Sequence, residues 1–212
     1  NQTKVDDPGY PMDVALSDDG VIMMVTYQFV EGSDTTSYVA FYNFGDVGQN
    51  EDDRIVSGYK YEGVVIPQIQ YLSNNRSVAL KDNGFTIYQG SQIPKEVKTV
   101  ETDKEIVSTF YDDDMIGMVF KNDSKDKQYT MEVYTTEGKL KFKQDFNIPY
   151  TTIRLSGGNI LMYNSSQMCV MNSRGVQKYM GSVDGTIKDF FKIGWNRYLL
   201  VLDSGVDVIK FG

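Results

Sequence analysis

The side chains that could do chemistry in this chain are carboxylates, because its 212 residues include no histidine. Ser-His-Asp hydrolysis, Cys-His nucleophiles and histidine-bound metal centres are therefore excluded. Two carboxylates flanking a glycosidic bond can still act as general acid and general base. The carboxylates considered for this role are Asp13, Glu105 and Asp189.

Acidic turns and the cysteine are the other candidates for chemistry. Asp18–Asp19 and Asp112–Asp114 could ligate Ca²⁺ through carboxylate oxygens, but the spacing of a dedicated calcium loop is missing. Consecutive acids on a tight turn point in different directions, so we expect solvated turns and predict no metal and no cofactor. Cys169 is the only cysteine and lies in an apolar run, which predicts a packed thiol and excludes an internal disulfide.

A strand-turn-strand unit that occurs five times positions these residues. Each copy has an apolar residue, a turn of Asp, Asn, Ser or Gly, and a second apolar run. The copies begin at Leu16, Leu72, Tyr111, Leu155 and Ile193. Spacings of 56, 39, 44 and 38 residues, with several strands in each, are typical of a β-propeller.

The predicted fold class is therefore all-β, a β-propeller with about five four-stranded antiparallel blades. We expect a single domain over residues 1–212, with residues 1–11 as a linker or closing strand. The blades are expected at about 12–62, 63–102, 103–148, 149–182 and 183–212. The fifth unit is one strand short, so two arrangements stay open: a closed ring completed by Thr3–Val5, or an arc of a larger propeller.

In a propeller the first strand of each blade lines the central channel, which gives a candidate binding site. The polar residues on these strands are Asp13, Gln68, Gln70, Glu105, Arg154, Lys188 and Asp189. Polar side chains are needed to solvate such a channel whether or not it is catalytic. The set is therefore predicted to bind a ligand, and no catalytic residue is assigned.

Composition limits the partners. A formal net charge of −8 and a pI near 4.6 disfavour nucleic acid, whose affinity depends on clustered cations. The lysines of Lys139–Lys143 alternate with Leu140 and Phe142, as on the solvated face of an outer strand.

No run of 18 apolar residues occurs, so we expect no direct membrane insertion by this chain, and an anchor upstream of Asn1 stays open. The acidic segment Gly45–Asp53 predicts an exposed loop.

Tyrosine is abundant, with 15 residues in the chain. Tyr59, Tyr61 and Tyr71 could expose rings that stack on a sugar or a peptide. Tyrosine is also a favoured strand residue, and packing between blades is the preferred interpretation.

The turn Ser17-Asp18-Asp19-Gly20 resembles the Ser-Pro-Asp-Gly turn of bacterial WD40-like, TolB-like and quinoprotein-like propellers, with Asp18 in place of proline. The Trp-Asp dipeptide of true WD repeats is absent. The chain also resembles an uncharacterised bacterial family of membrane-anchored, extracytoplasmic propellers. This resemblance implies a location outside the cytoplasm, either secreted or anchored at the cell surface.

The predicted function is a non-catalytic binding or sensing module that recognises a protein or a cell-envelope or carbohydrate ligand. One alternative is a glycan-processing enzyme that uses the carboxylates named first. Another is an assembly scaffold. Repeats without a recognisable catalytic motif favour the binding module, as expected for a scaffold that hosts many functions.

Overall fold

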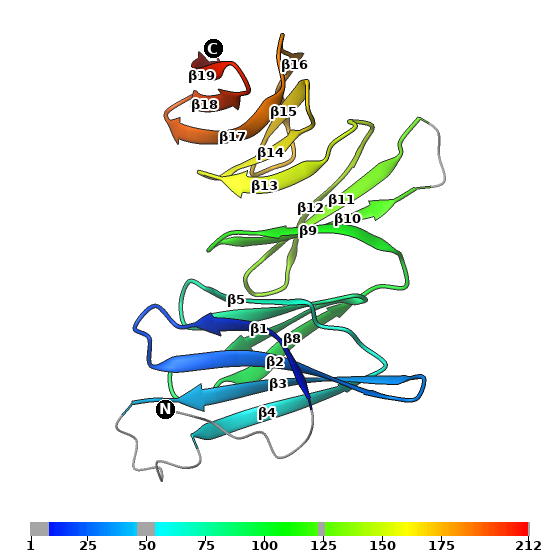
Figure 1. Ribbon diagram of the computed structural model, residues 1–212, viewed down its shortest axis with the longest axis vertical. Helices are drawn as coiled ribbons and strands as arrows, with labels where there is room; N and C mark the ends of the chain where they lie inside the picture. The colour runs from blue at the N-terminus through cyan, green and yellow to red at the C-terminus, as the bar shows by residue number, and fades with distance from the viewer. Residues whose placement is uncertain (1–8, 46–53, 123–125, 212) are drawn as a thin grey trace. The chain divides into compact units, whose positions relative to one another are not determined.

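The computed structural model describes residues 9–45, 54–122 and 126–211, and these residues form strands and turns without a helix (Figure 1). Nineteen strands in the described residues make five antiparallel sheets, each built from consecutive strands. The all-β prediction is therefore confirmed. Thr3–Val5 and most of the acidic segment Gly45–Asp53 lie outside the described residues.

The chain divides into two compact units, which are described separately. The first unit comprises residues 1–106 and 136–139 and contains two four-stranded sheets. Sheet 1 is β1 (Tyr10–Leu16), β2 (Ile22–Glu31), β3 (Asp34–Asn43) and β4 (Ile55–Glu62). Sheet 2 is β5 (Gln68–Leu72), β6 (Arg76–Lys81), β7 (Gly84–Gln89) and β8 (Lys95–Glu101).

The second unit comprises residues 107–135 and 140–212 and contains three sheets. Sheet 3 is β9 (Ile106–Tyr111), β10 (Met115–Lys121), β11 (Tyr129–Thr135) and β12 (Leu140–Phe146). Sheet 4 is β13 (Thr152–Ser156), β14 (Asn159–Tyr163), β15 (Gln167–Asn172) and β16 (Gln177–Ser182). Sheet 5 has three strands, β17 (Ile187–Gly194), β18 (Arg197–Leu202) and β19 (Gly205–Lys210).

Short turns between strands are set by local sequence. Between β13 and β14, Gly157 and Gly158 both have positive φ, 53° and 72°. Between β5 and β6, Asn74 and Asn75 take the same left-handed region, with φ of 62° and 54°. Two successive residues with positive φ match the right-handed twist of the strands they join, and asparagine and glycine tolerate that conformation best. The turn residues therefore fix the pairing of neighbouring strands.

In the first unit, sheets 1 and 2 pack face to face through one apolar cluster. Its buried members are Ala15, Ile22, Met24, Val39, Phe41, Ile66, Ile69, Tyr71, Ala79 and Tyr88. Tyr59 and Tyr61 pack against this cluster, and the Tyr61 hydroxyl donates to the Glu96 carboxylate at 3.0 Å. The three tyrosines considered for ligand stacking are thus engaged between sheets, which confirms the packing interpretation.

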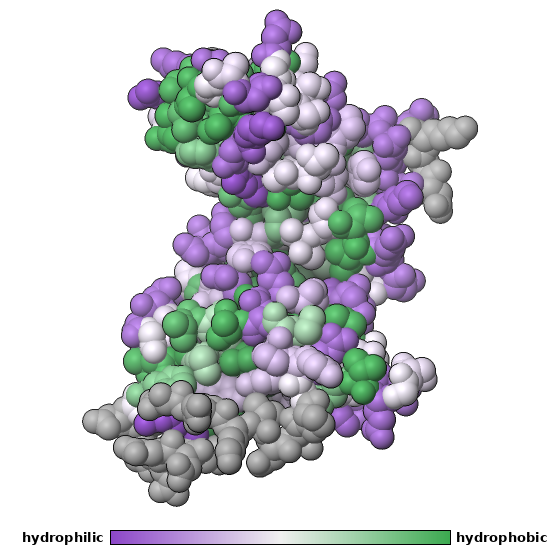
Figure 2. Space-filling model, viewed as in Figure 1, coloured by the Kyte–Doolittle hydropathy of each residue, from purple (hydrophilic) through white to green (hydrophobic). Residues whose placement is uncertain are grey.

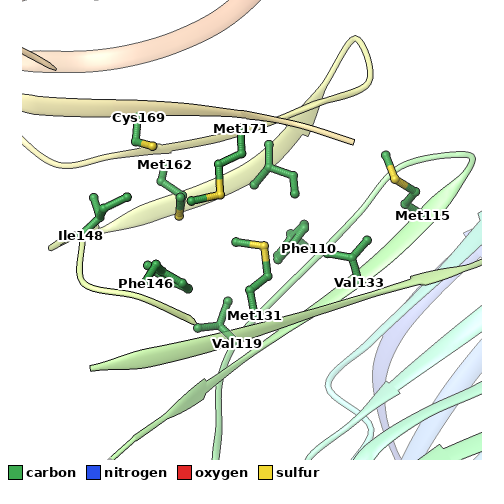
Figure 3. Packing of buried hydrophobic residues seen from close by; sticks show 11 residues of the cluster. Phe110, Met115, Val119, Met131, Val133, Phe146, Ile148, Met162, Cys169 and Met171 are labelled. Carbon is green, nitrogen blue, oxygen red and sulfur yellow. The ribbon is translucent and has the colours of Figure 1, made fainter. Parts of the chain in front are cut away.

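In the second unit, sheets 3 and 4 enclose a methionine-rich cluster (Figure 3). Phe110 lies against the backbone of Gly117 so closely that a Cβ there would come within 2.0 Å of the Phe110 ring. Cys169 is fully buried in this cluster, and burial raises the pKa of its thiol to about 12. The thiol therefore packs as a small apolar group, as the sequence predicts.

The pairing of third and fourth strands is the same in sheets 1 to 4. Each pair shifts register once, and the shifts fall between Phe41 and Tyr42, Ile87 and Tyr88, Val133 and Tyr134, and Val170 and Met171. Such a bulge bends the strand and increases the local twist. In sheet 5, by contrast, β18 and β19 pair without a shift.

Candidate functional site

The residues predicted to line a channel lie on or next to the first strand of each sheet. Asp13 is on β1, Gln68 and Gln70 are on β5, Arg154 is on β13, and Lys188 and Asp189 are on β17. Glu105 is exposed and directly precedes β9. Asp13, the two glutamines and Glu105 belong to the first unit, and Arg154, Lys188 and Asp189 belong to the second.

Asp13 joins sheet 1 to sheet 2. One carboxylate oxygen accepts the backbone N–H of Val14 at 2.9 Å, and the other accepts the N–H of Ile69 on β5, also at 2.9 Å. Both oxygens are therefore engaged with the main chain. A carboxylate held this way stabilises the contact between two first strands, and its use as a general base would require breaking that contact.

Arg154 and Asp189 form the corresponding link between sheets 4 and 5. The Arg154 guanidinium pairs with the Asp189 carboxylate, and its Nε donates to the Phe190 carbonyl at 3.2 Å. Asp189 also accepts the Tyr163 hydroxyl at 2.9 Å and the Phe190 N–H at 2.8 Å. The Arg154 guanidinium lies 5.8 Å from the centre of the Tyr163 ring, within cation–π range. Asp189 is thus a neutralised, multiply bonded carboxylate.

The two links use the same principle. In each, a charged side chain from a first strand bonds main-chain groups of the first strand of the next sheet. Three of the seven predicted residues, Asp13, Arg154 and Asp189, therefore connect neighbouring sheets. The repeat pattern predicted that these three residues lie on first strands. It did not predict their hydrogen-bond partners, which are 35 to 56 residues away in the sequence.

The acidic turns are closed by their own hydrogen bonds. Asp112 Oδ1 accepts the N–H groups of Asp114 at 2.9 Å and Met115 at 2.8 Å. Asp19 accepts the Ser17 hydroxyl at 2.6 Å and the Val21 N–H at 3.0 Å, and the Ser17 bond is the main cause that lowers the pKa of Asp19. Within the described ranges no three acidic or cysteine side chains gather in a way that could hold a metal ion.

A cleft in the second unit was not predicted from the sequence. It has a volume of about 530 Å³ and lies between the end of β12 with the segment after it and the β15–β16 hairpin. Phe146, Ile148 and Met171, all buried, come from the apolar cluster between sheets 3 and 4. Val176 and Met180, exposed by 58% and 47%, line the same cleft. The cleft therefore has apolar side chains that are accessible from solvent.

Polar groups and one glycine complete this cleft. Gln144, Asp145, Arg174 and Gln177 also line it. The Thr130 hydroxyl, which donates to Asp145 at 2.7 Å, is the main cause that lowers the pKa of that carboxyl. Gly175, with φ of 79°, turns the hairpin, and a Cβ there would come within 2.7 Å of the Phe142 ring. A glycine between two apolar runs is a sequence signal for a hairpin turn, but it does not by itself indicate the cleft beside the hairpin.

A second cleft, in the first unit, is polar. Its volume is about 600 Å³, and its lining includes the carboxylates of Glu31, Asp34 and Glu62 with the Phe29 ring. Glu62 pairs with Lys60 at 2.7 Å, and this contact lowers the pKa of the Glu62 carboxyl. Both partners of the pair are largely exposed, so the cleft resembles a solvated acidic surface.

Comparison with solved structures defines the class of protein. The chain is similar to BamB from Moraxella catarrhalis, with a TM-score of 0.50, 11% identity and coverage of 98% of this chain and 60% of that one. It is similar to the Pan2 WD40 domain of Neurospora crassa, with a TM-score of 0.52, 10% identity and coverage of 94% of this chain and 62% of that one. It is also similar to BBS1N in complex with ARL6DN, with a TM-score of 0.51, 12% identity and coverage of 94% of this chain and 64% of that one. The chain thus spans less than two thirds of each of these structures. With its five antiparallel sheets, it has the β-propeller fold of WD40-like and BamB-like proteins.

The sequence assigns the chain more narrowly. A family model described as "Family of unknown function (DUF5711)" matches residues 1–211, and the protein belongs to this family. Comparison with curated proteins gives no match. The described residues contain no helix that is long and apolar enough to cross a membrane.

Proposed function

We propose that the protein is a non-catalytic module that binds an extended segment of a partner protein in the cleft between sheets 3 and 4. The observation that carries this proposal is the accessible apolar lining of that cleft, in particular Val176 and Met180 beside the buried Phe146. Recognition sites for peptides combine apolar pockets with a few polar groups that orient the ligand. Gln144, Arg174 and Gln177 provide those polar groups here.

The engagement of the candidate carboxylates supports a non-catalytic role. Asp13 links sheet 1 to sheet 2 through the Ile69 N–H, and Asp189 links sheet 5 to sheet 4 through Arg154 and the Tyr163 hydroxyl. An acid and base pair for glycoside hydrolysis needs two carboxyl groups that face a common sugar. Likeness in fold at 12% identity or less indicates architecture alone, so the argument for binding depends on the cleft.

Selection of peptides would test the proposal. The immobilised chain is offered a phage library of random dodecapeptides, and the selected peptides are measured against Val176→Glu/Met180→Lys. We expect at least tenfold weaker binding to this variant, since it places two charges in the apolar lining. Val97→Glu, at a β8 valine with a comparable exposure of 52%, is the matched control and should bind as the original chain does. Equal binding to the cleft variant would refute the assignment.

The same variants separate a protein partner from a glycan. A glycan array probed with the chain should give no binding that depends on Val176 and Met180. Glycan binding sensitive to those residues, or release of sugar from an array ligand, would overturn the proposal in favour of a carbohydrate-directed role.

We also propose that the module works outside the cytoplasm, on the basis of the resemblance described above. Reporter fusions that are active on only one side of the membrane, made with the full open reading frame, would test this location.

A further inference from the structure

Exposed apolar residues occur at more than one place in the second unit, so exposure alone does not define a ligand. The surface over β17–β19 is hydrophobic in Figure 2, and Val206 and Val208 there are exposed by 60% and 52%. The cleft between sheets 3 and 4 carries more information because it combines apolar residues with a charge. Arg174 is the only lysine or arginine among the described residues that line it.

Arg174 has no partner for its side chain within the part of the chain that the structure describes. The residue is exposed and lies in the turn between β15 and β16. Its backbone N–H donates to Asn172 Oδ1 at 2.9 Å, but its guanidinium forms no hydrogen bond and no ion pair with a described residue. All five N–H donors of the guanidinium are therefore available to a ligand.

The carboxylate that lines the same cleft is already engaged. Asp145 accepts the Thr130 hydroxyl at 2.7 Å, and its other oxygen lies 3.4 Å from Lys127 Nζ. Neither Thr130 nor Lys127 lines the cleft. The negative charge of the cleft is thus compensated from outside it, whereas the positive charge is not. Complementarity of charge favours a ligand that brings an anionic group to Arg174.

The turn that carries Arg174 is held in place against β12. The Gly175 N–H donates to the Asn172 carbonyl at 3.0 Å, and the Val176 N–H donates to Asn172 Oδ1 at 3.1 Å. Gly175 also packs so closely on the Phe142 ring that a Cβ would come within 2.7 Å of it. The cation and the exposed Val176 side chain therefore flank one fixed residue. A ligand could engage both with neighbouring groups of its own.

On the basis of the proposed function, we infer that the segment bound in this cleft carries a carboxylate that pairs with Arg174. A large apolar side chain next to that carboxylate packs against Val176 and Met180, because these exposed residues line the same cleft. The carboxylate comes from an aspartate or glutamate side chain or from a chain's C-terminus, and a guanidinium binds either with two parallel hydrogen bonds. Phosphate groups on peptides are recognised by clusters of arginines, and this lining has one.

Competition between peptide pools would test the inference on the full chain. Four isotope-labelled pools of acetylated hexapeptides share four positions randomised among uncharged residues. They end in Gln-Leu-amide, Glu-Leu-amide, Gln-Leu with a free C-terminus, or phosphoserine-Leu-amide. The immobilised chain captures peptides from an equimolar mixture, and mass spectrometry measures the ratio of the pools.

We expect one of the two carboxylate pools to be enriched over the Gln-Leu-amide pool by at least about fivefold, as for a hydrogen-bonded ion pair at a partly exposed site. The enriched pool identifies the source of the carboxylate. Arg174→Gln keeps the backbone N–H that Asn172 accepts and should bring the ratio to about one. Arg197→Gln, at an exposed arginine that does not line the cleft, is the matched control and should leave the ratio unchanged.

The remaining outcomes separate this inference from the proposed function. Equal capture of the four pools, with capture lost in Val176→Glu/Met180→Lys, would overturn the carboxylate and keep the peptide cleft. Enrichment that persists in Arg174→Gln would show that the carboxylate pairs elsewhere, and preferred capture of the phosphoserine pool would show that the ligand is a phosphopeptide. If capture does not depend on Val176 and Met180, the cleft assignment and the inference both fall.

Discussion

Replacing Asp13 with asparagine tests whether the predicted channel residues are structural. The Asp13 carboxylate accepts one N–H with each oxygen, from Val14 and from Ile69, both at 2.9 Å. Asparagine has a single acceptor oxygen, so its NH₂ group would face one of these N–H donors. The residue Ile69 is only 2% exposed, which leaves little room for a replacement water. The substitution therefore replaces two hydrogen bonds to a charged carboxylate with one to a neutral oxygen, and it places an NH₂ group against the N–H of Val14 or of Ile69.

The expected cost follows from these contacts. A hydrogen bond to a charged group contributes about 1.5–3 kcal/mol, and we expect Asp13→Asn to destabilise the first unit by about 2 kcal/mol. That change corresponds to roughly 30-fold faster exchange of amides protected by unfolding of this unit. Urea unfolding followed by circular dichroism, with amide exchange in β1 and β5, measures both quantities. Asp18→Asn, on the exposed turn after β1, is the control and should change stability by less than about 0.5 kcal/mol.

Two results would refute this reasoning. If Asp13→Asn unfolds within about 0.5 kcal/mol of the original chain, the link between β1 and β5 contributes nothing measurable. If the variant keeps its stability but loses a glycan-hydrolysing activity that the original chain has, Asp13 is a catalytic carboxylate and the non-catalytic assignment is wrong.

Two further substitutions test packing and titration. Gly117→Ala should destabilise the second unit by about 1–3 kcal/mol because its Cβ would overlap the Phe110 ring, and this cost should shrink in a Phe110→Leu background. Gly58→Ala is its control in urea unfolding and should be nearly neutral, since the nearest atom to its Cβ would be 3.8 Å away. Burial is the main cause that raises the pKa of Asp112 above 3.8, so ionisation costs stability as pH rises through the folded-state pKa. Asp112→Asn keeps an acceptor for the Met115 N–H and should be more stable than the original chain at pH 7, with the difference lost near about pH 3 when unfolding is compared at the two pH values.

The fold could be predicted from the sequence because its determinants are local. Turns such as Gly157–Gly158 lie between apolar runs at regular spacing, and each turn specifies the pairing of the strands on either side. The preference for packed tyrosines is also confirmed, because Tyr61 and Tyr71 lie on strands β4 and β5 and pack in the apolar cluster between sheets 1 and 2. These inferences require only neighbours within a few residues.

The site could be predicted only in part, because its partners are distant in sequence. The position of Asp13 on a first strand follows from the repeat, but its acceptor role depends on Ile69, 56 residues away. The cleft between sheets 3 and 4 combines Phe146 with Val176, and no single segment indicates it. The three strands of sheet 5 in the described residues follow from the repeat pattern, whereas the pairing of β18 with β19 without a register shift required the structure.

The consecutive order of strands within every sheet has a consequence for biosynthesis. Because β13, β14, β15 and β16 pair only with the strands next to them in the chain, sheet 4 closes no loop longer than a turn as it forms. Contacts that are close in sequence have a low entropic cost and form quickly. A ribosome that releases the protein from its N-terminus would therefore supply each sheet complete before the next one is made, so that the growing polypeptide never has to wait for a distant segment to pair its strands.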